Sequence, residues 1–378
     1  MNDQVELGPK GLTVPLSTGP VYFNYYWLRD NCTSSIDPQT RERIFDISEL
    51  PGEPVAEEAA TQNDELVIDW RGEDHRTRYS LAWLEEFARR GHIADPADLP
   101  RRLWRSNQYP SFVRLDQSEV ENDLGARALF ARAIIEDGVA LITGMENSDE
   151  SLTRLARTLG EVIPTTDGFY FDVQLEIAPT NLAFTARALE MHTDLPSETL
   201  APGVQFLHCR ANSVQGGYSL FLDGAAVAED FRKSNPADFE LLATHKIPFF
   251  RRHERWDARS HQRVIELDRH GAVSGLTISQ HLADVFDLPQ DLLDDYYPAF
   301  CRFVHALKKP EYMNRFRLNA GECIVFDNHR VVHGREAFSA ETGKRHLRGC
   351  YVDMGALRST YRVLVREGRG GTMQEAAE

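Results

Sequence analysis

From residue 173 onward, short apolar runs alternate with turn-forming residues, and this pattern restricts the fold more than any other feature. The runs are VQLEIA, NLAFTA, GVQFLHCRA, YSLFLDG, HKIPFF, RVIELD, AVSGLTIS, FRLNAGECIVFDN and HLRGCYVDM. Many short strands in series are typical of a β-sandwich or barrel. Two stretches with helical spacing interrupt the series, at residues 231–245 and 288–310. The sequence therefore predicts a mainly β domain with helical insertions.

Two helices and a strand are expected ahead of this series. The stretch DLGARALFARAIIEDG predicts a helix that ends at Gly138, and VALITG predicts the strand that follows it. A second helix is expected over residues 148–162, and either Ser148 or Asp149 is its predicted N-cap.

The first 95 residues have a different pattern and predict a small β-rich domain. Runs at 12–16, 21–30 and 41–47 suggest an antiparallel sheet, and LVIDW adds a strand. The acidic stretch at 50–65 predicts an exposed loop, and SLAWLEEFARR predicts an amphipathic helix. The expected parts are a β-rich domain at 1–95, a linker at 96–115, a large β domain at 116–368 and a flexible tail at 369–378.

Composition narrows the class of protein. The formal net charge of −16 argues against nucleic acid as a partner, because that binding relies on Lys and Arg. No apolar run reaches the roughly 20 residues of a membrane span, and MNDQVELGPK lacks the apolar core of a signal peptide. The five cysteines are dispersed, which suits free thiols in a reducing compartment. We therefore expect a cytoplasmic protein without a membrane partner.

A His-x-Asp triplet, His192-Thr-Asp194, lies at the predicted end of a strand. The 13 His and 58 acidic residues would produce about two such triplets by chance. Most histidines in β domains are, moreover, hydrogen-bonded core or surface residues. In an extended segment, however, residues i and i+2 point the same way, so His192 and Asp194 can chelate one ion. Two histidines and one carboxylate on a β scaffold are typical of an Fe(II) site.

The third ligand must come from a strand that is distant in the sequence. His333 follows the apolar strand CIVFDN, and His329 competes with it for the role. The Gly-Arg pair after His333 and the basic residues beyond it favour His333. Among those residues, Arg345 and Arg348 can bind the free end of a dicarboxylate whose other end chelates the metal. Surface ion pairs are the commoner role of an arginine.

Four stretches together carry a resemblance to a known family. They are His192-Thr-Asp194, His333-Gly-Arg, Arg345-His-Leu and the opening Tyr26-Trp-Leu-Arg-Asp-Asn-Cys32. The chain resembles the γ-butyrobetaine and trimethyllysine hydroxylases, which are Fe(II)/2-oxoglutarate oxygenases of the taurine-dioxygenase-like superfamily. The likeness extends over nearly the whole chain, and a bacterial branch that acts on 2-(trimethylammonio)ethylphosphonate is the nearest in pattern.

The resemblance implies a fold, a chemistry and an assembly. The catalytic domain is expected to be a double-stranded β-helix, which is a distorted jelly roll, and the protein is expected to be a homodimer. His192, Asp194 and His333 map onto the iron ligands, with 2-oxoglutarate and O₂ as cosubstrates. Arg345 maps onto the residue that binds the distal carboxylate of 2-oxoglutarate. Further cosubstrate residues are expected at Ser219 and Arg348.

The zinc site that the family carries near its N-terminus is not kept. Of the three thiolates in the family's Cys-x-Cys-x-x-Cys, only Cys32 remains, because Ser34 and Asp37 take the other two places. His75 is left as a further partner, but a tetrahedral zinc site needs four good ligands. We therefore expect no structural zinc and a buried, hydrophobic role for Cys32.

The resemblance also indicates which residues bind the substrate cation. A trimethylammonium group donates no strong hydrogen bonds and is held by aromatic faces. Phe171, Phe184 and Tyr351 map onto the aromatic cage, whereas Asp167 takes the place of a further tyrosine. The carboxylate of Asp167 either adds charge attraction to the cage or simply lies in the turn Thr-Thr-Asp-Gly.

The opposite end of the substrate site also departs from the family. Asn181 keeps one of two anion-binding asparagines, Ser279 replaces the other, and Arg187 is added nearby. An added arginine suits a phosphonate, which carries more charge than a carboxylate. Strand parity, however, directs Arg187 away from His192. We expect hydroxylation of a small trimethylammonium compound, with 2-(trimethylammonio)ethylphosphonate ahead of γ-butyrobetaine and trimethyllysine third.

Two other classes of function compete with the enzyme. A quaternary-ammonium-sensing β-barrel would keep the cage and the iron without turnover. A scaffold protein with a decayed site would have lost at least one member of the set His192, Asp194, His333 and Arg345. Because the set is complete, the sequence favours an enzyme.

Overall fold

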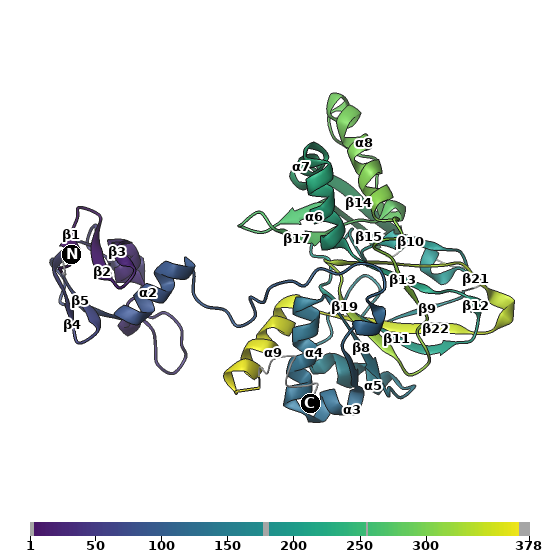
Figure 1. Cartoon of the computed structure of the whole chain (residues 1–378), viewed down its shortest axis with the longest axis horizontal. Coiled ribbons are helices and arrows are strands. Elements are labelled where there is room, and N and C mark those ends of the chain that lie inside the picture. The colour runs from purple at the N-terminus through teal and green to yellow at the C-terminus, as the bar shows by residue number, and fades with distance from the viewer. Residues whose placement is uncertain (1–3, 177–180, 255, 370–378) are drawn as a thin grey trace. The chain divides into compact units, whose positions relative to one another are not determined.

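The computed structural model describes residues 4–176, 181–254 and 256–369 (Figure 1). The chain divides into two compact units, Met1–Asp95 and Pro96–Glu378. Within the described ranges, no helix has both the length and the apolar character needed to cross a membrane. The flexible tail predicted at 369–378 lies outside these ranges except for Arg369.

The first unit contains two three-stranded antiparallel sheets and two helices. One sheet has the order β1-β2-β3, and the other has the order β4-β5-β6. The elements are β1 (Glu6–Leu7), β2 (Gly11–Leu16), β3 (Gly19–Asn24), α1 (Tyr25–Asp30), β4 (Ala56–Gln62), β5 (Glu65–Trp70), β6 (Arg76–Ser80) and α2 (Leu81–Arg90). Their buried side chains, including Leu12, Leu28, Ile68, Trp70 and Leu84, form one hydrophobic core.

Three details of this unit differ from the sequence predictions. The run 21–30 was expected to be extended, but its second half is the helix α1, which Asn24 caps by accepting from the Trp27 backbone N–H. The stretch 50–65 was expected to be a loop, yet it contains β4, whose exposed acidic residues suit an edge strand. No strand lies within 41–47. The helix predicted at 80–90 is present as α2.

Two facing sheets form the centre of the second unit. The larger has the order β7-β8-β19-β11-β22-β9, and the smaller has the order β10-β20-β13-β18. The larger sheet comprises β7 (Arg114–Asp116), β8 (Val139–Thr143), β19 (Cys323–Asp327), β11 (Val204–Asn212), β22 (Arg345–Val352) and β9 (Phe171–Gln174). The smaller comprises β10 (Leu189–His192), β20 (Val331–Arg335), β13 (Ser219–Asp223) and β18 (Asn314–Phe316). Phe326 of the larger sheet packs against Phe221 of the smaller, with ring centroids 5.0 Å apart.

Helices cover the outer face of each sheet. α4 (Leu124–Glu136), α5 (Asp149–Arg157) and α9 (Met354–Arg366) share a core with the larger sheet (Figure 1). α6 (Gly224–Ser234), α7 (Pro236–Thr244) and α8 (Gln290–Ala306) share a core with the smaller sheet. The two-sheet centre is consistent with the expected jelly roll. The unit is nevertheless mixed helix and strand, because these layers contribute as much of the core as the strands do.

The remaining elements lie outside these two central sheets and their covering helices. They are α3 (Gln117–Asn122), β12 (Gln215–Gly216), β14 (Lys246–His253), β15 (Trp256–Arg263), β16 (Ile265–Leu267), β17 (Val273–Leu276), β21 (Phe338–Ser339) and the 3₁₀ turns η1 (Thr33–Ser35), η2 (Ile47–Glu49), η3 (Tyr109–Ser111), η4 (Leu182–Phe184), η5 (Gln280–Leu282) and η6 (Ala340–Thr342). The run NLAFTA, expected to be a strand, contains η4 instead, because the Asn181 side chain caps a turn by accepting from the Ala183 N–H.

Local capping explains the two helices that were predicted ahead of the strand series. Ser148 caps α5 through the Ser151 N–H, which settles the choice between Ser148 and Asp149. The helix α4 gives way to β8 at Gly138, whose φ of +78° favours glycine.

The stretch proposed as a linker, 96–115, packs on the second unit. The Trp104 indole donates to the Asp137 carbonyl at 2.7 Å, and its backbone N–H donates to Asp223 at 3.1 Å.

Candidate active site

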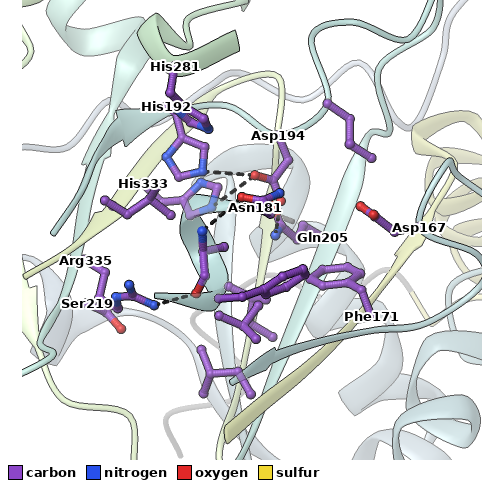
Figure 2. A pocket seen from close by; sticks show the side chains of 18 of the residues that line it. Asp167, Phe171, Asn181, His192, Asp194, Gln205, Ser219, His281, His333 and Arg335 are labelled. Carbon is purple, nitrogen blue, oxygen red and sulfur yellow. Dashed lines mark hydrogen bonds and ion pairs between the residues drawn. The ribbon is translucent and has the colours of Figure 1, made fainter. Parts of the chain in front are cut away.

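His192, Asp194 and His333 come together where β10 and β20 pair. The register of these strands places His192 directly opposite His333. Asp194 Oδ1 lies 3.1 Å from His192 Nε2 and 3.7 Å from His333 Nε2, and Figure 2 shows the three side chains pointing toward one another. Among the described residues, these three form the group of His, Cys, Asp and Glu side chains that can hold a metal ion. This is the set that the sequence predicted.

The surroundings of the three residues fix which atoms face the ion. His192 Nδ1 hydrogen-bonds the Glu190 carbonyl at 2.8 Å, which leaves Nε2 free to bind a metal. The Asp194 backbone N–H donates to Asn328 Oδ1 at 2.7 Å, and Asn328 Nδ2 donates back to the Asp194 carbonyl at 3.1 Å. The backbone at Asp194 is therefore fixed independently of any ion.

The protonation states also suit metal ligands. Burial, followed by the neighbouring His192, lowers the pKa of His333 to about 3, so the imidazole is neutral. Burial alone would raise the pKa of Asp194, but its contacts with His192, His333 and the Tyr351 hydroxyl hold it well below its ordinary value. The carboxylate is therefore anionic, as a ligand must be.

A second buried site for an anion lies at Arg345. Its side chain lines the same pocket as the three ligands and is 7% exposed. Its Nε is buried without a partner, and no carboxylate among the described residues pairs with the guanidinium. Burial and the neighbouring Arg335 lower the pKa of Arg345 to about 10, so the group is a cation at neutral pH. A buried, unpaired guanidinium fits the distal carboxylate of 2-oxoglutarate.

The other two residues predicted near the cosubstrate lie in different settings. Ser219, on β13, lines the pocket and pairs in register with Arg335. Arg348 does not line the pocket, and it pairs instead with Asp172 at 2.5 Å. Its place on β22 explains this, because Arg345 and Arg348 are an odd number of residues apart and point to opposite faces of the strand.

Aromatic side chains form one wall of the pocket beyond the ligands. The rings of Phe171 and Tyr351 stack with centroids 5.1 Å apart and an interplanar angle of 25°. Phe184 and Asn181 also line the pocket, on the turn η4. The turn is fastened by Arg335, whose guanidinium donates to the carbonyls of residues 183, 185 and 187.

Asp167 also lines the pocket, but its charge is matched by a residue that the sequence reasoning missed. Arg251, which is 6% exposed, forms a bidentate pair with Asp167 at 2.6 and 2.7 Å. Asp167 lies in the tight turn closed by Thr165 and Gly168, and its carboxylate also lines the pocket, so both features of the two readings are present. Because it is paired, Asp167 does not present an uncompensated negative charge to a cation.

Two residues predicted at the anion-binding end do not line the pocket. Arg187 lies in a bend ahead of β10 and is exposed, and Ser279 is fully buried behind the lining. Ser279 Oγ lies 3.3 Å from Nδ1 of His281, which does line the pocket and packs edge-on against His192. Burial, followed by the charge of His192, lowers the pKa of His281 to about 4. His281 is therefore a neutral hydrogen-bonding group beside the ligands.

The remnants of the zinc motif are used differently in the first unit. Cys32 is 1% exposed, and its Sγ lies 3.1 Å from Ser34 Oγ. The Asp37 carboxylate accepts from the backbone N–H groups of Gln39 and Thr40, which stabilise a turn. The expectation that zinc is absent stays a prediction.

Comparison with known proteins agrees with this geometry. The family model described as "Taurine catabolism dioxygenase TauD, TfdA family" matches residues 107–351. The chain belongs to this family. The expected resemblance is confirmed by relatives that match nearly its whole length. The gamma-butyrobetaine dioxygenase of Pseudomonas sp. (strain AK-1) is 34% identical over 367 residues, which cover 94% of each chain.

Other relatives of the family extend the comparison. The human gamma-butyrobetaine dioxygenase is 29% identical over 353 residues, which cover 89% of this chain and 90% of that one. The trimethyllysine dioxygenase of Gallus gallus is 28% identical over 357 residues, which cover 90% and 83%. The solved structure of AAD-2 in complex with Mn(II) and N-oxalylglycine shares the fold, with a TM-score of 0.52 at 15% identity, covering 66% of this chain and 97% of that one.

This TauD-family chain is a dioxygenase, and its site residues fit iron and 2-oxoglutarate. His192, Asp194 and His333 would hold the iron from one side, as a facial triad does. Arg345 would hold the far carboxylate of 2-oxoglutarate, since its guanidinium has no protein partner among the described residues.

Proposed function

We propose that this dioxygenase hydroxylates a small compound with a trimethylammonium group at one end and an anionic group at the other. The observation that carries the proposal is the Phe171–Tyr351 stack, which shares one pocket with the three metal ligands. Aromatic faces attract a quaternary ammonium ion, which forms no strong hydrogen bonds. The names of the relatives, gamma-butyrobetaine dioxygenase and trimethyllysine dioxygenase, point to the same class of substrate.

The pocket residues select the C–H bond by holding the substrate at both ends. When bound, iron and 2-oxoglutarate supply the oxidation, in which one atom of O₂ enters the substrate and the other enters succinate as CO₂ is released. Phe171 and Tyr351 bind the cation, and Asn181, His281 and Arg251 present polar groups to the anionic end. Leu189, Leu195 and Leu282 exclude water from the space between.

Within this class we propose 2-(trimethylammonio)ethylphosphonate as the first candidate and γ-butyrobetaine as the alternative, with trimethyllysine third. Because Arg187 and Ser279 do not line the pocket, this order depends on Arg251. A guanidinium has five N–H donors, of which Asp167 takes two and Thr166 takes one at 3.4 Å. The remaining donors have no hydrogen-bond partner among the described residues and suit the more highly charged phosphonate.

The order of substrates is tested by mass spectrometry of reactions with Fe(II), 2-oxoglutarate and each candidate in turn. We expect a product heavier by one oxygen atom and an equal amount of succinate, with the phosphonate turned over fastest. Faster turnover of γ-butyrobetaine would reverse the order. Absence of a hydroxylated product with all three candidates would refute the substrate class and favour a quaternary-ammonium sensor.

Arg251 and its neighbour Arg252 provide a matched pair of variants. Both lie on β14, but Arg251 is buried in the pocket, whereas Arg252 is exposed and pairs with Asp257 at 3.2 Å. Arg251→Gln is expected to lower kcat/KM for the phosphonate about 100-fold, because a buried charged contact is lost. Arg252→Gln is expected to change it less than about twofold. Equal effects of the two substitutions on kcat/KM would show that Arg251 does not bind the substrate.

A further inference from the structure

The Asp194 carboxylate has two oxygens in different environments. Oδ1 faces His192 and His333, where a metal would bind. Oδ2 accepts from Gln205 Nε2 at 2.6 Å and from the Tyr351 hydroxyl at 2.7 Å. Gln205 and Tyr351 are 1% and 3% exposed, so water does not compete for these bonds. The second oxygen is therefore held away from the metal position by two protein donors.

The direction of the hydrogen bond from Tyr351 is fixed by chemistry. An ionised carboxylate is acceptor-only, so the Tyr351 hydroxyl donates to Asp194 Oδ2. Gln205 and Tyr351 come from adjacent strands, because they are directly opposite each other in the register of β11 and β22. The two donors thus belong to the rigid centre of the larger sheet.

We propose that Tyr351 and Gln205 are positioning residues that restrict Asp194 to binding iron through one oxygen. A carboxylate that bound through both oxygens would take one of the positions that a facial triad leaves open for cosubstrate and O₂. Partners of metal ligands commonly orient them in this way, and their loss lowers metal affinity about 10- to 100-fold. The resemblance had placed Tyr351 only in the substrate cage, and nothing in the sequence indicated that Gln205 contacts a metal ligand.

Tyr351 also links the metal to the substrate wall. Its ring stacks on Phe171 while its hydroxyl contacts the metal ligand, so one side chain has two separable functions. Phe171, by contrast, contributes only its ring, which makes it a matched control. This second part of the inference rests on the proposed function, whereas the metal-positioning part does not.

The metal part is tested by binding of Co(II) and Mn(II) to the full-length protein without substrate. Tyr351→Phe, which keeps the ring, and Gln205→Leu are each expected to weaken metal binding about 10- to 100-fold and to alter the visible absorption of bound Co(II). Thermal unfolding of the metal-free variants confirms that each is folded. Wild-type affinity and a wild-type Co(II) spectrum in both variants would overturn the inference.

The two functions of Tyr351 are separated by comparison with Phe171→Leu. This variant is expected to keep metal affinity within about twofold and to raise the Kd of the substrate found by mass spectrometry about tenfold. Tyr351→Phe is expected to weaken metal binding about 10- to 100-fold and to leave the Kd of that substrate nearly unchanged, because it keeps the ring. If Phe171→Leu weakened metal binding as much as Tyr351→Phe, the effect would be one of general packing, and the positioning role would be refuted. Failure of the substrate class would leave the metal result intact.

Discussion

The two ends of the pocket are built on different kinds of structure. At the iron end, His192, Ser219 and His333 lie on neighbouring strands of the smaller sheet, and Arg345 begins β22 of the larger one. At the substrate end, Phe171, Tyr351 and Arg251 lie on strands, but Asp167, Asn181, Phe184 and His281 lie on turns and loops. The hydrogen-bond register fixes the first set, whereas side-chain contacts such as those of Arg335 hold the second.

This difference explains why the iron ligands could be proposed from spacing, whereas the substrate residues in the pocket lining were proposed only from the resemblance. Residues on paired strands have positions set by spacing and strand parity, so a short motif is sufficient. Residues on loops have positions set by contacts with distant parts of the chain, which spacing does not encode. Variants at each end of the pocket test this explanation.

The largest effect is expected at the metal ligands. His333→Ala is expected to lower kcat/KM by about 1000-fold or more, which is roughly 4 kcal/mol, because one side of the metal site is lost. The control is His329→Ala, since His329 is the competing histidine and instead contacts the Ala201 carbonyl at 2.8 Å. Succinate formation measures both. Similar losses in the two variants would show that the strand register does not define the ligands.

A smaller effect is expected for the cosubstrate. Arg345→Gln is expected to raise the KM for 2-oxoglutarate about 100-fold, because a buried charged contact is removed. Arg348→Gln is expected to change it less than about threefold, since Arg348 faces the other side of β22 and pairs with Asp172. Steady-state rates at varied 2-oxoglutarate concentration distinguish the two. A larger effect of Arg348→Gln would contradict the parity argument.

Several secondary-structure elements could be predicted from the sequence, and others could not. The strands at the iron end and the helices α2, α4 and α5 follow from apolar spacing and from local caps such as Ser80 and Ser148. The helix α1 was missed because Tyr25 and Trp27 favour strands, although Leu28 and Arg29 are buried with Tyr25 at helical spacing. There, tertiary burial and a cap outweighed intrinsic preference.

Arg251 and Gln205, which the sequence reasoning missed, differ in whether the sequence carried a signal for them. Ile247, Phe249 and Arg251 share one face of β14, and all three are buried. A charged residue at an apolar position of a strand is a signal for a functional site, and it could have been found. Gln205 gave no such signal, because its role depends on a contact with Asp194 that only the folded sheets create.

Stability against acid is expected to depend on His208, which lies on β11 close to Gln205. His208 is fully buried, both its ring nitrogens lack partners, and burial, with Arg210 and His346, lowers its pKa from 6.5 to about 4. The unfolded chain therefore binds a proton that the folded chain does not, and stability is lost as pH falls from 6.5 toward 4. The loss from this residue at pH 5 is about 2 kcal/mol.

Urea unfolding at pH 7.5 and pH 5 measures this contribution. The variant His208→Leu is expected to lose about 2 kcal/mol less than the wild type between the two pH values. If His208→Leu and the wild type lost the same stability between the two pH values, burial would not be lowering the pKa of His208.

The smallest effect is expected at Arg187. Because Arg187 is exposed and lies outside the pocket lining, Arg187→Ala is expected to change kcat/KM for the phosphonate less than about twofold. Competition assays with the phosphonate and γ-butyrobetaine check this value. A tenfold loss specific to the phosphonate would mean that the loop carrying Arg187 turns into the pocket when substrate binds.

The central claim is that strands β10 and β20 build an iron and 2-oxoglutarate site from His192, Asp194 and His333. Its most direct test is the visible absorption of the anaerobic protein with Fe(II) and 2-oxoglutarate. We expect a charge-transfer band that requires both Fe(II) and 2-oxoglutarate and that disappears in His333→Ala but not in His329→Ala. A folded wild-type protein that shows no such band would contradict the assignment of an iron and 2-oxoglutarate site.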